Sequence, residues 1–103
     1  MAFAELAAEW DDDNLEHIAL HGTEPQEIEE VVFEDCYRSW TVRDRRRQRR
    51  RAERRLVIFG QTCGGRYLVV VIAVYRDRAV WRAVTAWPME PQTRRRYQQW
   101  RGN

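Results

Sequence analysis

Apolar residues recur every three or four positions along the first third of the chain, which is the spacing of one face of a helix. Aspartates at 11–13 offer N-cap oxygens and favourable charge, and Gly22 suits the position just beyond a helix end. We therefore expect a first helix over residues 11–20. Thr23, with Gln26 three residues later, has the form of a capping box for a second helix that ends near Phe33.

From Tyr37 onward the apolar period changes to two, which is typical of strands. Gly64–Gly65 marks a tight turn, and the run from Tyr67 to Tyr75 is continuously apolar. Such a run predicts a strand covered on both faces, or a central strand with one face left to a partner. Four antiparallel strands are expected, over residues 37–43, 55–62, 66–76 and 79–86.

Pro88 and Pro91 end the strand pattern, and a last helix is expected over residues 90–100, with Tyr97 and Trp100 on one stripe. Two helices, four antiparallel strands and a helix define an α+β fold. With 103 residues the chain has room for one core, so we expect a single domain over residues 1–103.

The sequence carries no pattern of a signal peptide, and no apolar run approaches the roughly 20 residues that span a bilayer. Cys36 and Cys63 belong to no CxxC or Cys/His cluster. We therefore expect two reduced and mostly buried thiols, no metal and no cofactor. These features predict a cytoplasmic protein without membrane contact.

Charge is divided between two parts of the chain. Residues 1–37 carry twelve Asp and Glu and no basic side chain other than two His, whereas residues 38–103 carry eighteen Arg against four acidic residues. The net charges are −12 and +14, and the chain has no Lys. Nine of the arginines lie between Arg43 and Arg55. Because the guanidinium fork grips phosphate at two points, a polyanion is the first partner that this composition indicates.

Three segments carry a family pattern: WDDDNLEHIALHGTEPQEIEEVVFED, ERRLVIFGQTCGGRYLVVVIAVY and WRAVTAWPMEPQTRRRY. They resemble the BrnT family of bacterial toxins in type II toxin–antitoxin systems, over about Glu9 to Tyr97. The most specific parts are the Trp-Asp start with Asn14, the His21–Gly22 pair and the Gly-Gly-Arg hairpin. The resemblance implies a RelE-like fold, cleavage of RNA that halts growth, and inhibition by a small DNA-binding antitoxin.

The chain departs from the family pattern at two positions. Trp87 stands where the family usually has Arg, and Thr93 stands where a Glu is common. If the absent Arg helps to stabilise the cleaved phosphate, this member is a weak nuclease or a binding module.

Cleavage of an RNA phosphodiester needs a base for the 2′-hydroxyl proton, a donor that stabilises phosphate charge and an acid for the leaving oxygen. Arginine supplies only the second of these, because it stays protonated. Without Lys, proton transfer falls to a short list of residues: His17, His21, Asp44, Glu53 and Tyr97.

Charge division and resemblance together predict the site. Arg55 and Arg82 hold the phosphate, Glu53 or His21 moves the proton, and Tyr97 positions or stacks on the RNA. Further RNA contacts are expected from the arginine run, the hairpin and the last helix: Arg45, Arg46, Arg47, Arg49, Arg50, Arg51, Arg66 and Arg96.

Each assignment has a structural alternative. His21 can cap the first helix, Glu53 and Arg55 can form a surface ion pair, and Arg82 can pair with an acidic residue of the first third. The acidic helices can neutralise the basic sheet or dock an antitoxin. The predicted function is a toxin that is a metal-independent endoribonuclease, alone, as a homodimer or bound to an antitoxin. The alternative is a non-catalytic module that binds RNA or the antitoxin.

Overall fold

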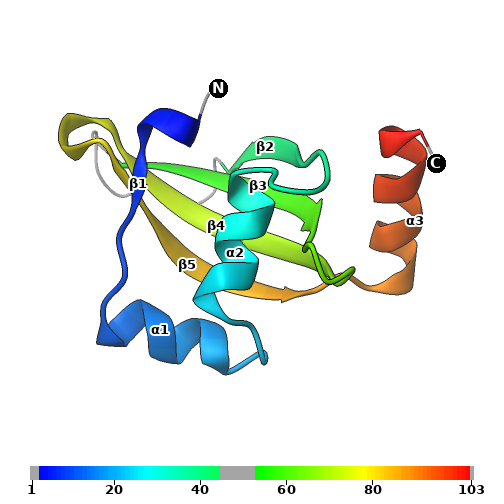
Figure 1. The fold of residues 1–103 in the computed structure, drawn as a ribbon, viewed down its shortest axis with the longest axis horizontal. Coiled ribbons are helices and arrows are strands. Elements are labelled where there is room, and N and C mark those ends of the chain that lie inside the picture. The colour runs from blue at the N-terminus through cyan, green and yellow to red at the C-terminus, as the bar shows by residue number, and fades with distance from the viewer. Residues whose placement is uncertain (1–2, 45–52, 103) are drawn as a thin grey trace.

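The computed structural model describes residues 3–44 and 53–102. Within these ranges the chain forms a mixed five-stranded sheet, with α1 (Asp12–Ala19) and α2 (Pro25–Val32) on one face and α3 (Pro91–Arg101) at one end (Figure 1). The predicted α+β class is therefore confirmed. The strands are β1 (Ala7–Ala8), β2 (Trp40–Asp44), β3 (Glu53–Gln61), β4 (Tyr67–Tyr75) and β5 (Val80–Pro88). Short 3-10 turns occupy Phe3–Glu5 and Arg76–Arg78.

The strand order is β1-β5-β4-β3-β2, and β2 to β5 are antiparallel neighbours. The prediction of four antiparallel strands missed β1, which pairs in parallel with β5 through Ala7 and Ala8. Two alanines are too short a segment to display a period. Their strand exists because the edge of β5 is there to pair with, and only the tertiary structure supplies that edge.

Both N-terminal helices begin at capped residues, but the predicted cap of α2 is wrong. Asp11 caps α1 by accepting a hydrogen bond from the Asn14 N–H at 3.1 Å. The N-cap of α2 is Glu24, whose N–H donates to the Glu27 carboxylate at 3.1 Å. Thr23 is buried, and its hydroxyl donates to the Ile18 carbonyl at 2.7 Å. Thr23 therefore satisfies a backbone carbonyl at the end of α1, and it does not cap the start of α2.

The main core lies between the sheet and the two N-terminal helices. α1 packs against β5, and α2 packs against β3 and β4. Ile72 on β4, Trp81 on β5 and Ile28 on α2 are fully buried members of this core. Along β4 the even-numbered residues belong to the core, because alternate side chains of a strand point to opposite faces.

A disulfide joins Cys36, in the turn after α2, to Cys63, in the turn between β3 and β4. The Cα atoms are 5.2 Å apart although 27 positions separate the residues. The prediction of two reduced and mostly buried thiols is therefore wrong, since both cysteines are exposed and bonded. Sequence spacing has no signal for this pair, because the packing of α2 on the sheet brings the two turns together.

α3 is held by its aromatic stripe at the end of the sheet. Tyr97 is fully buried, and its hydroxyl donates to the Arg38 carbonyl. Trp100 stacks on Trp40 with ring centroids 5.9 Å apart. The Arg38 guanidinium donates to the carbonyls of Trp100 and Arg101, at the C-terminal end of the helix. No helix in residues 3–44 and 53–102 is long and apolar enough to cross a membrane.

Candidate functional site on the open face of the sheet

The sheet face opposite α1 and α2 carries a groove of about 620 Å³. Odd-numbered residues of β3 and β4 form its floor, as the alternation of strand side chains requires. Residues from α1, the four long strands and α3 line it: His17, Asp44, Arg55, Val57, Phe59, Val69, Val71, Val84, Thr85, Trp87 and Thr93.

The groove has an aromatic end and a charged end, and the strand register separates them. Phe59 and Trp87 are both paired with Val69, and this is the aromatic end. Asp44 and Arg55 are directly opposite each other on β2 and β3, two residue pairs farther along than Val57. A nucleic acid needs surfaces for its bases and for its phosphates, and such a groove offers both.

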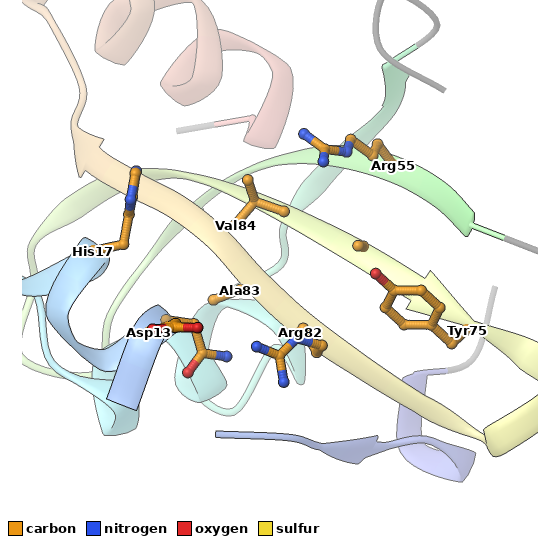
Figure 2. Close-up of a pocket in the computed structure, with 9 residues that line it drawn as sticks. Asp13, His17, Arg55, Tyr75, Arg82, Ala83 and Val84 are labelled. Carbon is orange, nitrogen blue, oxygen red and sulfur yellow. The ribbon is translucent and has the colours of Figure 1, made fainter. Parts of the chain in front are cut away.

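A second hollow, of about 260 Å³, adjoins the charged end. His17, Arg55 and Val84 line both spaces, so the two hollows are adjacent. Figure 2 shows these three residues with Tyr75 and Arg82 around the hollow. The remaining lining residues are Asp13, Asn14, Ala73 and Ala83. The site is thus built from the start of α1 and from β3, β4 and β5.

Arg82 lines the second hollow, but its guanidinium is engaged by two carboxylates. It contacts Glu9 at 2.9 Å and Asp11 at 2.7 Å, and Glu9 also contacts Arg78 at 3.2 Å. Burial acts to lower the pKa of Arg82, but the bonds to Glu9 and Asp11 outweigh it and raise this pKa. The geometry therefore matches the structural alternative for Arg82, an acidic partner from the first third of the chain.

The same network holds the start of α1. The pKa of Asp11 is lowered, first because its carboxylate accepts the Asn14 N–H and then because it bonds to Arg82. Asn14 is buried, and its side-chain amide donates to the Glu9 carbonyl at 2.9 Å. Arg82 therefore positions the N-terminus of α1, the helix that carries His17 to the groove.

Other predicted site residues lie elsewhere. Tyr97 belongs to the α3 anchor, and burial raises its hydroxyl pKa while the hydrogen bond with Arg101 opposes the rise. Arg66 lies on the helix-covered side of the sheet, where it binds Glu27 at 2.8 Å and the Gly22 carbonyl at 3.0 Å. His21 is exposed in the turn after α1 and lines neither hollow.

The remaining predictions concern residues about which the structure says less. Arg96 is exposed on α3 and lines neither hollow. Glu53 begins β3 opposite Tyr75, and only its backbone is described. Arg45, Arg46, Arg47, Arg49, Arg50 and Arg51 lie outside the described residues.

Sequence reasoning named His17 and Asp44 only as members of a list of proton-transfer candidates, and did not place them beside Arg55. The register of the β2–β3 hairpin brings Asp44 opposite Arg55, so a correct register would have paired these two. Nothing in the sequence indicates that α1 carries His17 across to the same groove. Trp87 and Thr93, the two departures from the family pattern, both line it.

Chemically, the groove combines a guanidinium, an imidazole and a carboxylate. A guanidinium stabilises phosphate charge, and an imidazole both accepts and gives up a proton near neutral pH. Within the described ranges no cluster of three His, Cys, Asp or Glu side chains is arranged to hold a metal ion. No protein-family model matches the sequence, and no curated protein matches it significantly.

Proposed function

We propose that this chain is a toxin of a type II toxin–antitoxin system, an endoribonuclease that binds single-stranded RNA in the open-face groove and cleaves it without a metal. One observation carries the proposal: Arg55, Asp44 and His17 line the same groove as the aromatic rings of Phe59 and Trp87. The resemblance to BrnT toxins supplies the reaction, and the groove supplies a place for it.

The arginine run supports the same surface. Residues 45–52 connect Asp44 at the end of β2 to Glu53 at the start of β3, so the run begins and ends at strands that border the groove. A stretch so rich in guanidinium groups is expected to attract the phosphates of RNA. Such binding weakens steeply with salt, because each phosphate contact releases counterions.

In the proposed reaction Arg55 stabilises the phosphate and His17 transfers the proton. His17 takes this role from His21 because it lines the groove and His21 does not. Glu53 remains a second candidate, since it lies two residues before Arg55 on the same strand. Phe59 and Trp87 offer rings for stacking with bases.

Two pairs of matched variants test these roles in a cleavage assay with purified protein and a labelled RNA. His17→Ala is expected to lower cleavage about 100-fold or more, as loss of a general acid or base does, whereas His21→Ala keeps the wild-type rate. Arg55→Ala is expected to lower it about 100-fold, as loss of a charge-stabilising donor does. Its control is Arg54→Ala, since Arg54 is paired with Val74 and faces the other side of the sheet.

Wild-type cleavage in His17→Ala and loss in His21→Ala would reverse the assignment in favour of the residue that the sequence alone suggested. Equal rates in all four variants would remove the groove from the mechanism. Circular dichroism of each variant separates a lost fold from a lost function.

The proposal also includes a small DNA-binding antitoxin as partner and the cytoplasm as the place where RNA is met. Disulfides persist mainly in oxidising compartments, so the state of the exposed Cys36–Cys63 bond in cells tests this location. Alkylation of thiols in protein taken from acid-quenched cells measures this directly.

A second candidate function is a non-catalytic module that binds RNA or the antitoxin. Two observations favour it: Glu9 and Asp11 occupy Arg82, and Trp87 takes the groove position where the family pattern has Arg. The same assay distinguishes a binding module from a nuclease, because a protein that only binds RNA retains the labelled RNA on a filter and leaves it uncleaved. Growth arrest on induced expression, with degraded cellular RNA, identifies the toxin.

A further inference from the structure

The second hollow contains polar side chains of two kinds. Arg82 and Asn14 are engaged by protein groups, as described above. No side chain in the described part of the chain forms a hydrogen bond with the Asp13 carboxylate, the His17 imidazole or the Tyr75 hydroxyl, and all three line the hollow. Asp13 and His17 are exposed and Tyr75 is half-buried, so all three groups are open to a ligand that enters the hollow.

The arrangement of these groups selects among polar ligands. Figure 2 shows Asp13 and His17 on one side of the hollow and Tyr75 on the other, with Val84 between them. A carboxylate only accepts hydrogen bonds, whereas a tyrosine hydroxyl donates as well. The hollow therefore offers an acceptor on one side and a donor on the other, with Val84 and Arg82 between them.

Guanine is the RNA base that matches this pattern. Its Watson–Crick edge presents two adjacent donors, N1–H and the N2 amino group, and its O6 and N7 are acceptors. Adenine and cytosine present one amino group beside an acceptor, and uracil presents one N–H between two carbonyls. When a carboxylate faces the edge of any of these three bases, one of its oxygens accepts a hydrogen bond and the other oxygen is repelled by the lone pair of an acceptor on the base.

Position and size agree with a base pocket. The hollow adjoins Arg55, the proposed phosphate contact, so a nucleotide bound there has its phosphate at the charged end of the groove. Its volume of about 260 Å³ corresponds to roughly nine water molecules at ~30 Å³ each, a space of the order of one base.

We propose that the hollow lined by Asp13, His17 and Tyr75 is a guanine-specific base pocket, with Asp13 as the specificity-determining residue. The proposal rests on RNA binding in the groove and adds to it the base that is read. Single-stranded RNA with an unstacked guanine is then the preferred substrate class.

Binding of short labelled oligouridines by the full chain tests this, with one central uridine replaced by guanosine, inosine or adenosine. The guanosine oligomer is expected to bind at least about tenfold more tightly than the adenosine oligomer, since one bidentate contact gives discrimination of this size. Inosine lacks the N2 amino group and is expected to fall between them.

Asp13→Asn is expected to remove the preference for guanosine over adenosine, because an amide also offers a donor. Asp12→Asn is the matched control: it makes the same change of charge in the same first turn of α1, at a residue that lines neither hollow, and it keeps the preference. Tyr75→Phe is expected to weaken guanosine and inosine binding by similar factors, since both bases have O6.

The outcomes separate this inference from the proposed function. If wild-type protein binds the guanosine, inosine and adenosine oligomers equally, the guanine pocket is wrong and RNA binding stands. If Asp12→Asn and Asp13→Asn lost the preference for guanosine over adenosine equally, the pocket would also be overturned. The preference would then depend on net charge and not on Asp13. If no oligomer binds, the RNA-binding proposal and the pocket fall together.

Discussion

The two faces of the sheet use the same strands in different ways. On the helix-covered face, β3, β4 and β5 contribute aliphatic residues and Trp81 to a core closed by α1 and α2. On the open face, α3 covers only the end where Tyr97 and Trp100 pack, and the remainder is the groove that Arg55 and His17 line. Side chains on the helix-covered face must fit the shape and volume of the core, whereas side chains on the open face leave a surface available for a ligand.

The continuously apolar β4 illustrates the difference. Val70 and Val71 are neighbours in this strand and are 0 % and 7 % exposed. Val70 is in the helix-covered core, whereas Val71 lines the groove floor. Burial alone therefore does not distinguish a stabilising residue from a binding residue. What distinguishes them is whether the protein or an open space lies over the side chain.

The largest expected effect concerns the Cys36–Cys63 disulfide, which links the turn after α2 to the turn between β3 and β4. Reduction of Cys36–Cys63, or the double change Cys36→Ser and Cys63→Ser, is expected to lower the free energy of unfolding by about 3–4 kcal/mol, because a closed loop of this length restricts the unfolded chain. Urea unfolding with and without dithiothreitol measures it. Dithiothreitol should leave the double serine variant unchanged, and an equal response in that variant would contradict the interpretation.

A smaller effect compares the two faces directly. Val70→Ala is expected to cost about 2–3 kcal/mol of unfolding free energy, from lost burial plus a closed cavity. Val71→Ala is expected to cost about half as much, because the space it leaves opens into the groove and can hydrate. The two variants, matched in chemistry, are compared by urea unfolding. Equal costs would show that the groove is closed in solution.

The smallest effect concerns acid stability at the start of α1. The folded pKa of Asp11 is depressed, so its stabilising contribution is present above the unfolded pKa of about 4 and is lost as pH falls through the folded pKa. Asp11→Ser keeps an N-cap oxygen but removes the carboxylate that contacts Arg82. The variant is therefore expected to show a shallower loss of melting temperature below pH 4 than the wild type. Parallel curves would exclude Asp11 as a contributor.

Most of the fold could be predicted from the sequence, because helix and strand periods are local. Helices over residues 11–20, 23–33 and 90–100 correspond to α1, α2 and α3 within a few residues, and the four long strands were found. Two of the misses share one cause. β1 and the disulfide each join segments far apart in the chain, and spacing does not encode such contacts.

The candidate site was predictable only in part. Arg55 was chosen from charge and family pattern, and the structure places it at the groove. His21 was preferred over His17 because the family pattern contains the His21–Gly22 pair, yet one helical turn decides which imidazole reaches the sheet. Tyr75 and Asp13 carry no sequence signal as a pair, because β4 and α1 bring them together across 61 intervening residues.

The sequence by itself determined the three helices, the four longer strands, the α+β class and the division of charge, since each follows from local spacing and composition. Only the tertiary structure decided which charges neutralise each other and which line a groove. The physical reason is that ion pairs, disulfides and hollows depend on distances between side chains. Those distances are set when α1 and α2 pack on one face of the sheet and leave the other face open.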